Sequence, residues 1–150
     1  MTSNDEIRDR LAICDLKARY CRLLDTKQWD AWRELFTEDY VLDTSAAGGG
    51  PPVHGRDAVM AAVLSSIEHA VTAHQVHFPE ITLNGDEALA VFPMQDRVLW
   101  GPARPSITGY GHYHDRLVRR HGEWKIAALK LTRLPVDVAP VPSTPKGDAS

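Results

Sequence analysis

The chain has 150 residues, which is the size of one domain that buries about 70% of the surface of its unfolded chain. Its 43% hydrophobic and 25% charged residues and its net charge of -3 are ordinary for a globular protein. This composition excludes the basic footprint of a nucleic-acid binder, and the absence of a membrane-length apolar run or a signal sequence argues against a membrane partner.

The first predicted element is a helix that begins at a capping box of Ser3 and Glu6 and runs to about Asp25. Its apolar stripe, in steps of four and three, is predicted to contain Ile7, Leu11, Cys14, Ala18 and Cys21. The next position on this stripe is Asp25. Because burial of an unpaired charge is costly, Asp25 is either a functional carboxylate or a residue that ends the helix and caps the next one.

A flanking stripe of the same helix contains Tyr20 together with Ile13, Leu16 and Leu24. A tyrosine inside needs a hydrogen-bond partner for its hydroxyl, and that partner is either a ligand or a structural group. Cys14 and Cys21 are two turns, or roughly 10 Å, apart on the helix, which is too far for a disulfide. We expect two reduced thiols and therefore a cytoplasmic protein.

In the middle of the chain, the sequence predicts elements whose main role is to pack apolar side chains in the core. A second short helix is expected to present Trp29, Trp32, Leu35 and Phe36 on one face, and a strand to run from Tyr40 to Asp43. The stretch from Ala46 to Pro52 reads as a flexible loop, either a cover for a site or a plain surface connection. Asp57 then opens a third helix with inward residues Val59, Met60, Val63, Leu64 and Ile67.

Residues 72–83 and 87–100 predict a hairpin whose loop length decides which side chains share a face. A three-residue loop, Asn84-Gly85-Asp86, pairs Leu83 with Glu87 and places His74 opposite Asp96. A two-residue loop would split the apolar residues between faces, although bulges at the prolines 79 and 93 would also change the count. The three-residue loop gathers one apolar face from Val76, Phe78, Phe92, Met94, Val98 and Trp100.

The longest predicted element is a hairpin from Ser106 to Leu134 with a tight turn at His121-Gly122. An outward face that carries residues such as Trp124 and Ile126 would need covering by a second copy of the chain. The proline-rich residues 135–150 are expected to be disordered or to form an arm on a neighbouring subunit. His112 and His114 share one strand face, but a catalytic zinc needs a third convergent ligand, so no metal is expected.

Three segments carry a resemblance to a known family: RYCRLLDTKQWDAWRELFTEDY, TAHQVHFPEITLNGDEALA and GHYHDRLVRRHGEWKIAALKLTR. In their order they resemble the SnoaL-like domain of the nuclear transport factor 2-like superfamily. The resemblance implies an α+β domain over residues 1–134, in which a cone-shaped, curved mixed sheet is wrapped by three helices from the N-terminal half. Similar members include scytalone dehydratase, bile-acid dehydratase, hexachlorocyclohexane dehydrochlorinase, ketosteroid isomerase and polyketide cyclases.

The same resemblance implies site residues. Asp25 and His74 match the Asp–His pair of the dehydratase and dehydrochlorinase branch, while the bile-acid dehydratase pattern adds matches at Tyr20, Asp96 and Arg133. The expected lining of the substrate pocket is His112, Tyr113, Phe92, Met94, Val76 and Trp100.

These residue types suit a cofactor-independent lyase or isomerase for a hydrophobic, cyclic small molecule such as a steroid, terpenoid or aromatic polyketide. Two alternatives stay open: a non-catalytic binding or accessory protein of the same fold, and a protein-interaction module with an open apolar sheet face. The resemblance also implies a homodimer or homotrimer.

Overall fold

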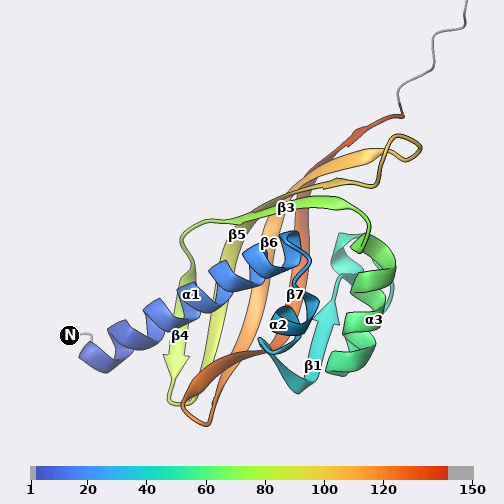
Figure 1. Cartoon of the computed structure of the whole chain (residues 1–150). Helices are drawn as coiled ribbons and strands as arrows, with labels where there is room; N and C mark the ends of the chain where they lie inside the picture. Colours follow the sequence, from blue (N-terminus) through green and yellow to red (C-terminus); the bar gives the residue numbers. More distant parts are fainter. Residues whose placement is uncertain (1–2, 142–150) are drawn as a thin grey trace, which may run out of the picture.

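A computed structural model describes residues 3–141 of the chain (Figure 1). Its elements follow the order α1 (Asn4–Asp25), α2 (Trp29–Arg33), β1 (Phe36–Asp43), a 3-10 turn η1 (Ser45–Ala47), β2 (Val53–His54), α3 (Arg56–Ile67), β3 (Val71–Val76), β4 (Glu80–Asn84), β5 (Glu87–Leu99), β6 (Ser106–Arg120) and β7 (Glu123–Ala139). None of the helices in this range has the length and apolar character needed to cross a membrane.

The sheet is curved and mixed, with strand order β2-β1-β7-β6-β5-β3 and β4 also paired with β5. Only the β1–β7 pair among these strands is parallel. Helix α1 lies across the sheet and α3 lies beside β1 (Figure 1). The predicted α+β architecture of three helices against one curved sheet is confirmed, and it gives the sheet an inner face that packs on the helices and an outer face that does not.

Helix α1 begins and ends as predicted, but its buried face differs from the predicted stripe. Ser3 accepts a hydrogen bond from the Glu6 amide at 3.2 Å, and the Ser3 amide donates to Glu6 at 2.9 Å, which completes the capping box. The prediction for the stripe is wrong at Ile7 and Leu11, which are 47% and 61% exposed, and at Ala18, which is also exposed. The larger side chains of the flanking stripe bury more apolar area against the sheet. The buried residues of α1 are Ile13, Leu16, Lys17, Tyr20, Cys21, Leu23 and Leu24.

The middle elements keep the predicted core residues but change their backbone. Helix α2 ends at Arg33, so the prediction that it includes Leu35 and Phe36 is wrong. Phe36 instead opens β1, four residues before the expected start at Tyr40. The four residues predicted for one face of this helix still pack in the core or against it: Trp29, Trp32, Leu35 and Phe36. In α3 only Val59 is fully buried, because this helix covers the edge of the sheet rather than its centre.

The register of β3 and β4 on β5 combines one wrong prediction with one that is confirmed. The turn has two residues, Gly85-Asp86, and Asn84 rather than Leu83 is paired with Glu87. His74 is nevertheless opposite Asp96 and Val76 is opposite Met94, as predicted. Residues 77–79 between β3 and β4 oppose only residues 92 and 93 of β5, and this extra residue restores the count. The extra residue also moves Phe78 away from the predicted apolar face, and Phe78 is 97% exposed.

The β6–β7 hairpin is confirmed, with positive φ angles of 50° at His121 and 81° at Gly122 in its turn. Strand β7 continues to Ala139, five residues past the predicted boundary at Leu134, and Ala139 pairs with Ser106. The end of the predicted tail, residues 142–150, lies outside the described residues. Trp124 and Ile126 are 7% and 0% exposed beneath the helices, so the prediction that they form an outward face is wrong.

One ion pair lies inside the core. The Lys17 ammonium on α1 donates to both carboxylate oxygens of Asp115 on β6, at 3.2 and 2.8 Å, and the side chains are 1% and 0% exposed. The same ammonium lies 4.3 Å from the centre of the Tyr20 ring and 4.0 Å from that of Tyr113. Burial raises the pKa of Asp115, an effect that the Lys17 charge opposes. Each ion is therefore tolerable only because the other is present.

We expect Lys17→Met to lower the free energy of unfolding by about 3–5 kcal/mol, because it leaves a buried carboxylate without its cation. The double variant Lys17→Met/Asp115→Leu should recover most of that loss, since neither charge is then buried. Urea unfolding at pH 7 measures both. Arg8→Met, at an exposed Arg8–Asp5 pair, is the control and should change stability by less than about 1 kcal/mol. Equal losses in the single and double variants would contradict this account.

Candidate active site

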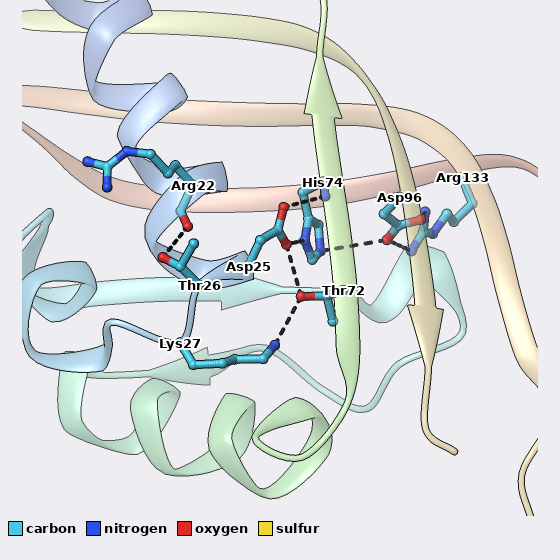
Figure 2. Close-up of polar contacts among 8 residues, drawn as sticks. All are labelled: Arg22, Asp25, Thr26, Lys27, Thr72, His74, Asp96 and Arg133. Carbon is cyan, nitrogen blue, oxygen red and sulfur yellow. Dashed lines mark hydrogen bonds and ion pairs between the residues drawn. The ribbon is translucent and has the colours of Figure 1, made fainter. Parts of the chain in front are cut away.

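Asp25 and His74 meet where the end of α1 lies against β3 (Figure 2). His74 Nδ1 is 2.6 Å from Asp25 Oδ1, and the backbone amide of His74 donates to Asp25 Oδ2 at 2.7 Å. The Thr72 hydroxyl, two residues earlier on the same strand face, donates to Asp25 Oδ1 at 2.9 Å. The predicted contact between Asp25 and the His74 ring is present. Asp25 is thus a functional candidate and does not serve only to end the helix.

These hydrogen bonds favour the ionised form of Asp25 and set which nitrogen of the His74 ring faces it. Partial burial acts to raise the pKa of Asp25, but the bonds from the His74 ring, the His74 amide and Thr72 outweigh it, so this pKa lies below its ordinary value. Asp25 is therefore a carboxylate at neutral pH, and the His74 nitrogen that faces it, Nδ1, carries a proton. The other ring nitrogen, Nε2, is left with a free lone pair in the neutral ring.

Asp96 and Arg133 form a second pair on the far side of the ring (Figure 2). Arg133 makes a bidentate contact with Asp96 at 2.7 and 2.8 Å, and Asp96 Oδ2 is 4.0 Å from His74 Nε2. A separation of 4.0 Å is too long for a hydrogen bond, so Nε2 is not engaged by Asp96. The pair lies directly over the α-carbon of Gly109, where any side chain would collide with both groups. This explains a glycine in the middle of β6.

The rings of Tyr20 and Tyr113 lie next to each other, with centroids 5.9 Å apart, on α1 and on the inner face of β6. Burial raises the pKa of both phenols well above 10.0, and neighbouring groups that include Asp96 add to this shift. Within residues 3–141 neither hydroxyl has a hydrogen-bond partner, and neither is sealed from solvent as the unpartnered Tyr40 hydroxyl is. Both phenols are protonated donors without an acceptor of their own.

Four supporting residues were not anticipated from the sequence. Thr72 lies two residues before His74, and the strand alternation could have identified it. Lys27 adopts a positive φ of 59° just after α1 and donates to the Thr72 hydroxyl at 3.0 Å. Lys17 lies one helical turn before Tyr20, so it was a charged residue beside a predicted buried stripe. Asp115 lies two residues after Tyr113, on a strand for which no buried face was predicted. No sequence pattern showed that these last two would pair.

The remaining predicted residues divide into two groups. Val76, Phe92 and Met94 lie on the inner face with His74 and Asp96, as predicted. Trp100 lies beyond the end of β5, where its indole donates to the Ser66 carbonyl of α3 at 2.9 Å. His112 lies on the opposite face of β6 from Tyr113, with its ring 6.3 Å from that of His114, so the prediction that it lines the pocket is wrong. In residues 3–141 no three His, Cys, Asp or Glu side chains converge as a metal site would need.

We expect Asp25→Asn to lower the free energy of unfolding at pH 7 by about 1.5–3 kcal/mol, the value of hydrogen bonds to a charged group. Because the folded-state pKa of Asp25 is lowered, its contribution is complete above the unfolded-state pKa of about 4 and disappears as pH falls through the lower, folded-state pKa. Urea unfolding of both proteins between pH 7 and pH 3 should therefore show the difference shrinking. Asp137→Asn, at an exposed carboxylate, is the control. A difference that is constant down to pH 3 would rule out this role.

Comparison with known proteins places this geometry in a family. A family model for a SnoaL-like domain matches residues 5–130. An uncharacterized protein of Mycobacterium tuberculosis is 29% identical over 129 residues, which covers 84% of this chain and 86% of the relative.

Several solved structures share the fold. A proposed aromatic ring hydroxylase from Novosphingobium aromaticivorans is 27% identical with a TM-score of 0.80, covering 89% of this chain and 94% of that one. A proposed scytalone dehydratase from the same species is 24% identical with a TM-score of 0.79, covering 100% of both chains. A type 2 hexachlorocyclohexane dehydrochlorinase is 18% identical with a TM-score of 0.80, covering 95% and 97%. Because the family model matches most of the chain, residues 5–130, this chain belongs to the SnoaL-like domain family of the nuclear transport factor 2-like superfamily.

Proposed function

We propose that the protein is a cofactor-independent lyase or isomerase in which His74 removes a proton from a carbon atom of a small hydrophobic, cyclic molecule. The observation that carries the proposal is the 2.6 Å contact between His74 Nδ1 and Asp25 with Nε2 left free. A neutral imidazole with one nitrogen bound to a carboxylate and the other free is the arrangement of a general base.

The proposed reaction uses both sides of the ring. His74 Nε2 takes the proton, and the electron pair of the broken C–H bond forms a carbon–carbon double bond. Asp25 stabilises the imidazolium that results. In an elimination the leaving group departs with its bonding electrons; in an isomerisation the imidazolium returns the proton to a different carbon. The two outcomes require the same base and differ only in the substrate.

The charges around His74 suit this chemistry. Asp25 and Asp96 are each balanced by a neighbouring cation, since Arg133 binds Asp96 and Lys27 lies next to Thr72 and Asp25. The ring therefore sits in a nearly neutral environment. We propose that the unpartnered hydroxyls of Tyr20 and Tyr113 donate to the oxygen that gains negative charge, with Arg133 as a further positive group. The apolar side chains of Val76, Phe92 and Met94 would contact the rest of the ligand.

The names of two structural neighbours support elimination, because a dehydratase and a dehydrochlorinase both remove a proton from carbon as a leaving group departs. The third neighbour is named for hydroxylation of an aromatic ring, which is a different chemistry. A non-catalytic binding protein would use the same apolar face, and Asp25 against His74 would then contribute only to stability. This residue pair favours an enzyme.

The test is a thermal-shift screen with steroids, terpenoids and aromatic polyketides, because a molecule that binds only the folded state raises the melting temperature. Each binder is then incubated with the protein in D₂O and followed by mass spectrometry. Loss of water or of an acid from the molecule identifies a lyase. A gain in mass from deuterium bound to carbon, with no group lost, identifies an isomerase. Binding with neither change identifies a binding protein.

For a substrate found in this way, His74→Ala should reduce kcat by at least about 10²–10⁴-fold with little change in ligand affinity, because the base is lost. Asp25→Asn should also be severely impaired, since an amide cannot stabilise the imidazolium. The double variant should be no worse than the poorer single one. His69→Ala, at a histidine that follows α3 and has a 93% exposed side chain, is the matched control and should retain wild-type turnover. Losses that multiply in the double variant would mean that the two residues act independently.

We further propose that the protein is a homodimer or homotrimer. The support is the outer face of the sheet, where Leu89 is 59% exposed and lines a groove of about 370 Å³, and where Tyr110 is 37% exposed further along β6. Asp43 and Lys130 both border this groove, so two copies could place opposite charges together. We expect sedimentation at micromolar concentration to show the oligomer and Leu89→Lys to shift it toward monomer. A wild-type protein that sediments only as a monomer would exclude it.

A further inference from the structure

A second hollow of about 340 Å³ lies between α1 and the junction of β3 with β4. It is lined by Cys14, Val76, His77, Phe78, Pro79 and Phe92. The volume falls at the lower end of the range for small-molecule sites, roughly 300–1,000 Å³, and most of the lining is apolar. Its walls come from the three segments that meet where the β3–β4 register shifts.

The hollow adjoins the candidate active site in the sheet, because its lining residue Val76 lies on the same strand as His74. Val76 follows His74 by two residues on the same face of β3, a step of about 6.6 Å along a strand. Opposite Val76 lies Met94, whose sulfur is 3.6 Å from an Arg133 guanidinium nitrogen, and Arg133 in turn binds Asp96. Val76 lines the hollow, and the Val76–Met94 pair is the next inward-facing pair to His74 and Asp96 in the sheet.

The rim of the hollow is unusually apolar and exposed. Phe78 is 97% exposed, so its ring has almost no packing within its own chain. Leu11, which is 61% exposed, lies one helical turn before Cys14 on α1 and extends the same apolar surface. Exposed aromatic side chains next to a concave apolar surface are typical of binding sites. The extra residue between β3 and β4 thus removes Phe78 from the sheet face and places it at this rim.

We propose that this hollow is the mouth of the active site and the subsite for the nonpolar ring of the ligand, with Phe78 packing on that ring. The inference rests on the proposed function and extends it to the substrate: a molecule with an apolar ring at one end and its reacting polar end at His74. A second protein chain fits the feature less well, because the lining residue Val76 neighbours His74 on the same strand face, which ties the hollow to the candidate site rather than to the outer surface.

The test measures binding of 2-naphthol, a fused aromatic ring with one hydroxyl, by isothermal titration calorimetry. Phe78→Ala should weaken binding by about 2- to 10-fold, the value of one aromatic contact. Cys14→Phe, which fills the hollow from α1, should weaken it by at least about tenfold. Val71→Ala is the matched control, because Val71 is 70% exposed at the start of β3 and does not line the hollow, so binding should be unchanged.

A second measurement does not depend on these substitutions folding. N-ethylmaleimide should modify the half-buried Cys14 faster than the buried Cys21, and saturating 2-naphthol should slow the reaction at Cys14. Peptide mass spectrometry distinguishes the two thiols. Reaction at Cys14 that is unaffected by 2-naphthol, or no binding of 2-naphthol at millimolar concentration, would overturn the proposal.

The outcomes also separate this subsite from the catalytic proposal. If turnover of a substrate depends on His74 but Phe78→Ala and Cys14→Phe bind 2-naphthol as the wild type does, the subsite is wrong and the catalytic role stands. If 2-naphthol binding follows the expected pattern but no ligand is ever turned over, the subsite stands and the catalytic role falls. A Phe78→Ala variant that changes the oligomeric state without changing 2-naphthol affinity would assign the hollow to contact between copies and overturn the proposal.

Discussion

The candidate site depends on the contact between the last residue of α1 and strand β3. Asp25 accepts hydrogen bonds from the backbone amide of His74, from its ring and from Thr72, so one carboxylate fixes the helix end, the strand and the imidazole together. One residue more or less in the helix would rotate this carboxylate by about 100° around the axis. The capping box at Ser3 and the burial of Tyr20 therefore bear on the site, because they set how α1 lies on the sheet.

Charge neutralisation is the second condition that the inner face satisfies. Its ionised groups are found in partnered sets: Asp25 near Lys27, Asp96 with Arg133, and Asp115 with Lys17. An unpaired charge at any of these depths would be costly, whereas each pair leaves its surroundings nearly neutral. Within residues 3–141, the ring nitrogen Nε2 of His74 and the hydroxyls of Tyr20 and Tyr113 lie next to these neutralised pairs and have no hydrogen-bond partner of their own.

The pairing of His74 with Asp96 shows how a correct prediction can follow from two errors that cancel. The expected three-residue loop is absent, but an extra residue before Pro79 shifts the register by the same amount. Side-chain alternation along β3 and β5 constrained the result, because a shift of the register by one residue would place His74 and Val76 on the opposite face from Met94 and Asp96. Phe78 was misplaced because the shift lies at its own position. His112 was misplaced because a family pattern does not state which face of β6 a residue occupies.

The sequence by itself determined the type of each main element, the identity of the Asp25–His74 pair and the α+β class, since these follow from local periodicity, capping and recognisable segments. Only the tertiary structure decided which stripe of α1 is buried, that Lys17 pairs with Asp115, and that Gly109 makes room for the Asp96–Arg133 contact. The physical reason is that local patterns specify how a segment can present its side chains, whereas burial and charge pairing depend on partners 37 to 98 residues away in the chain.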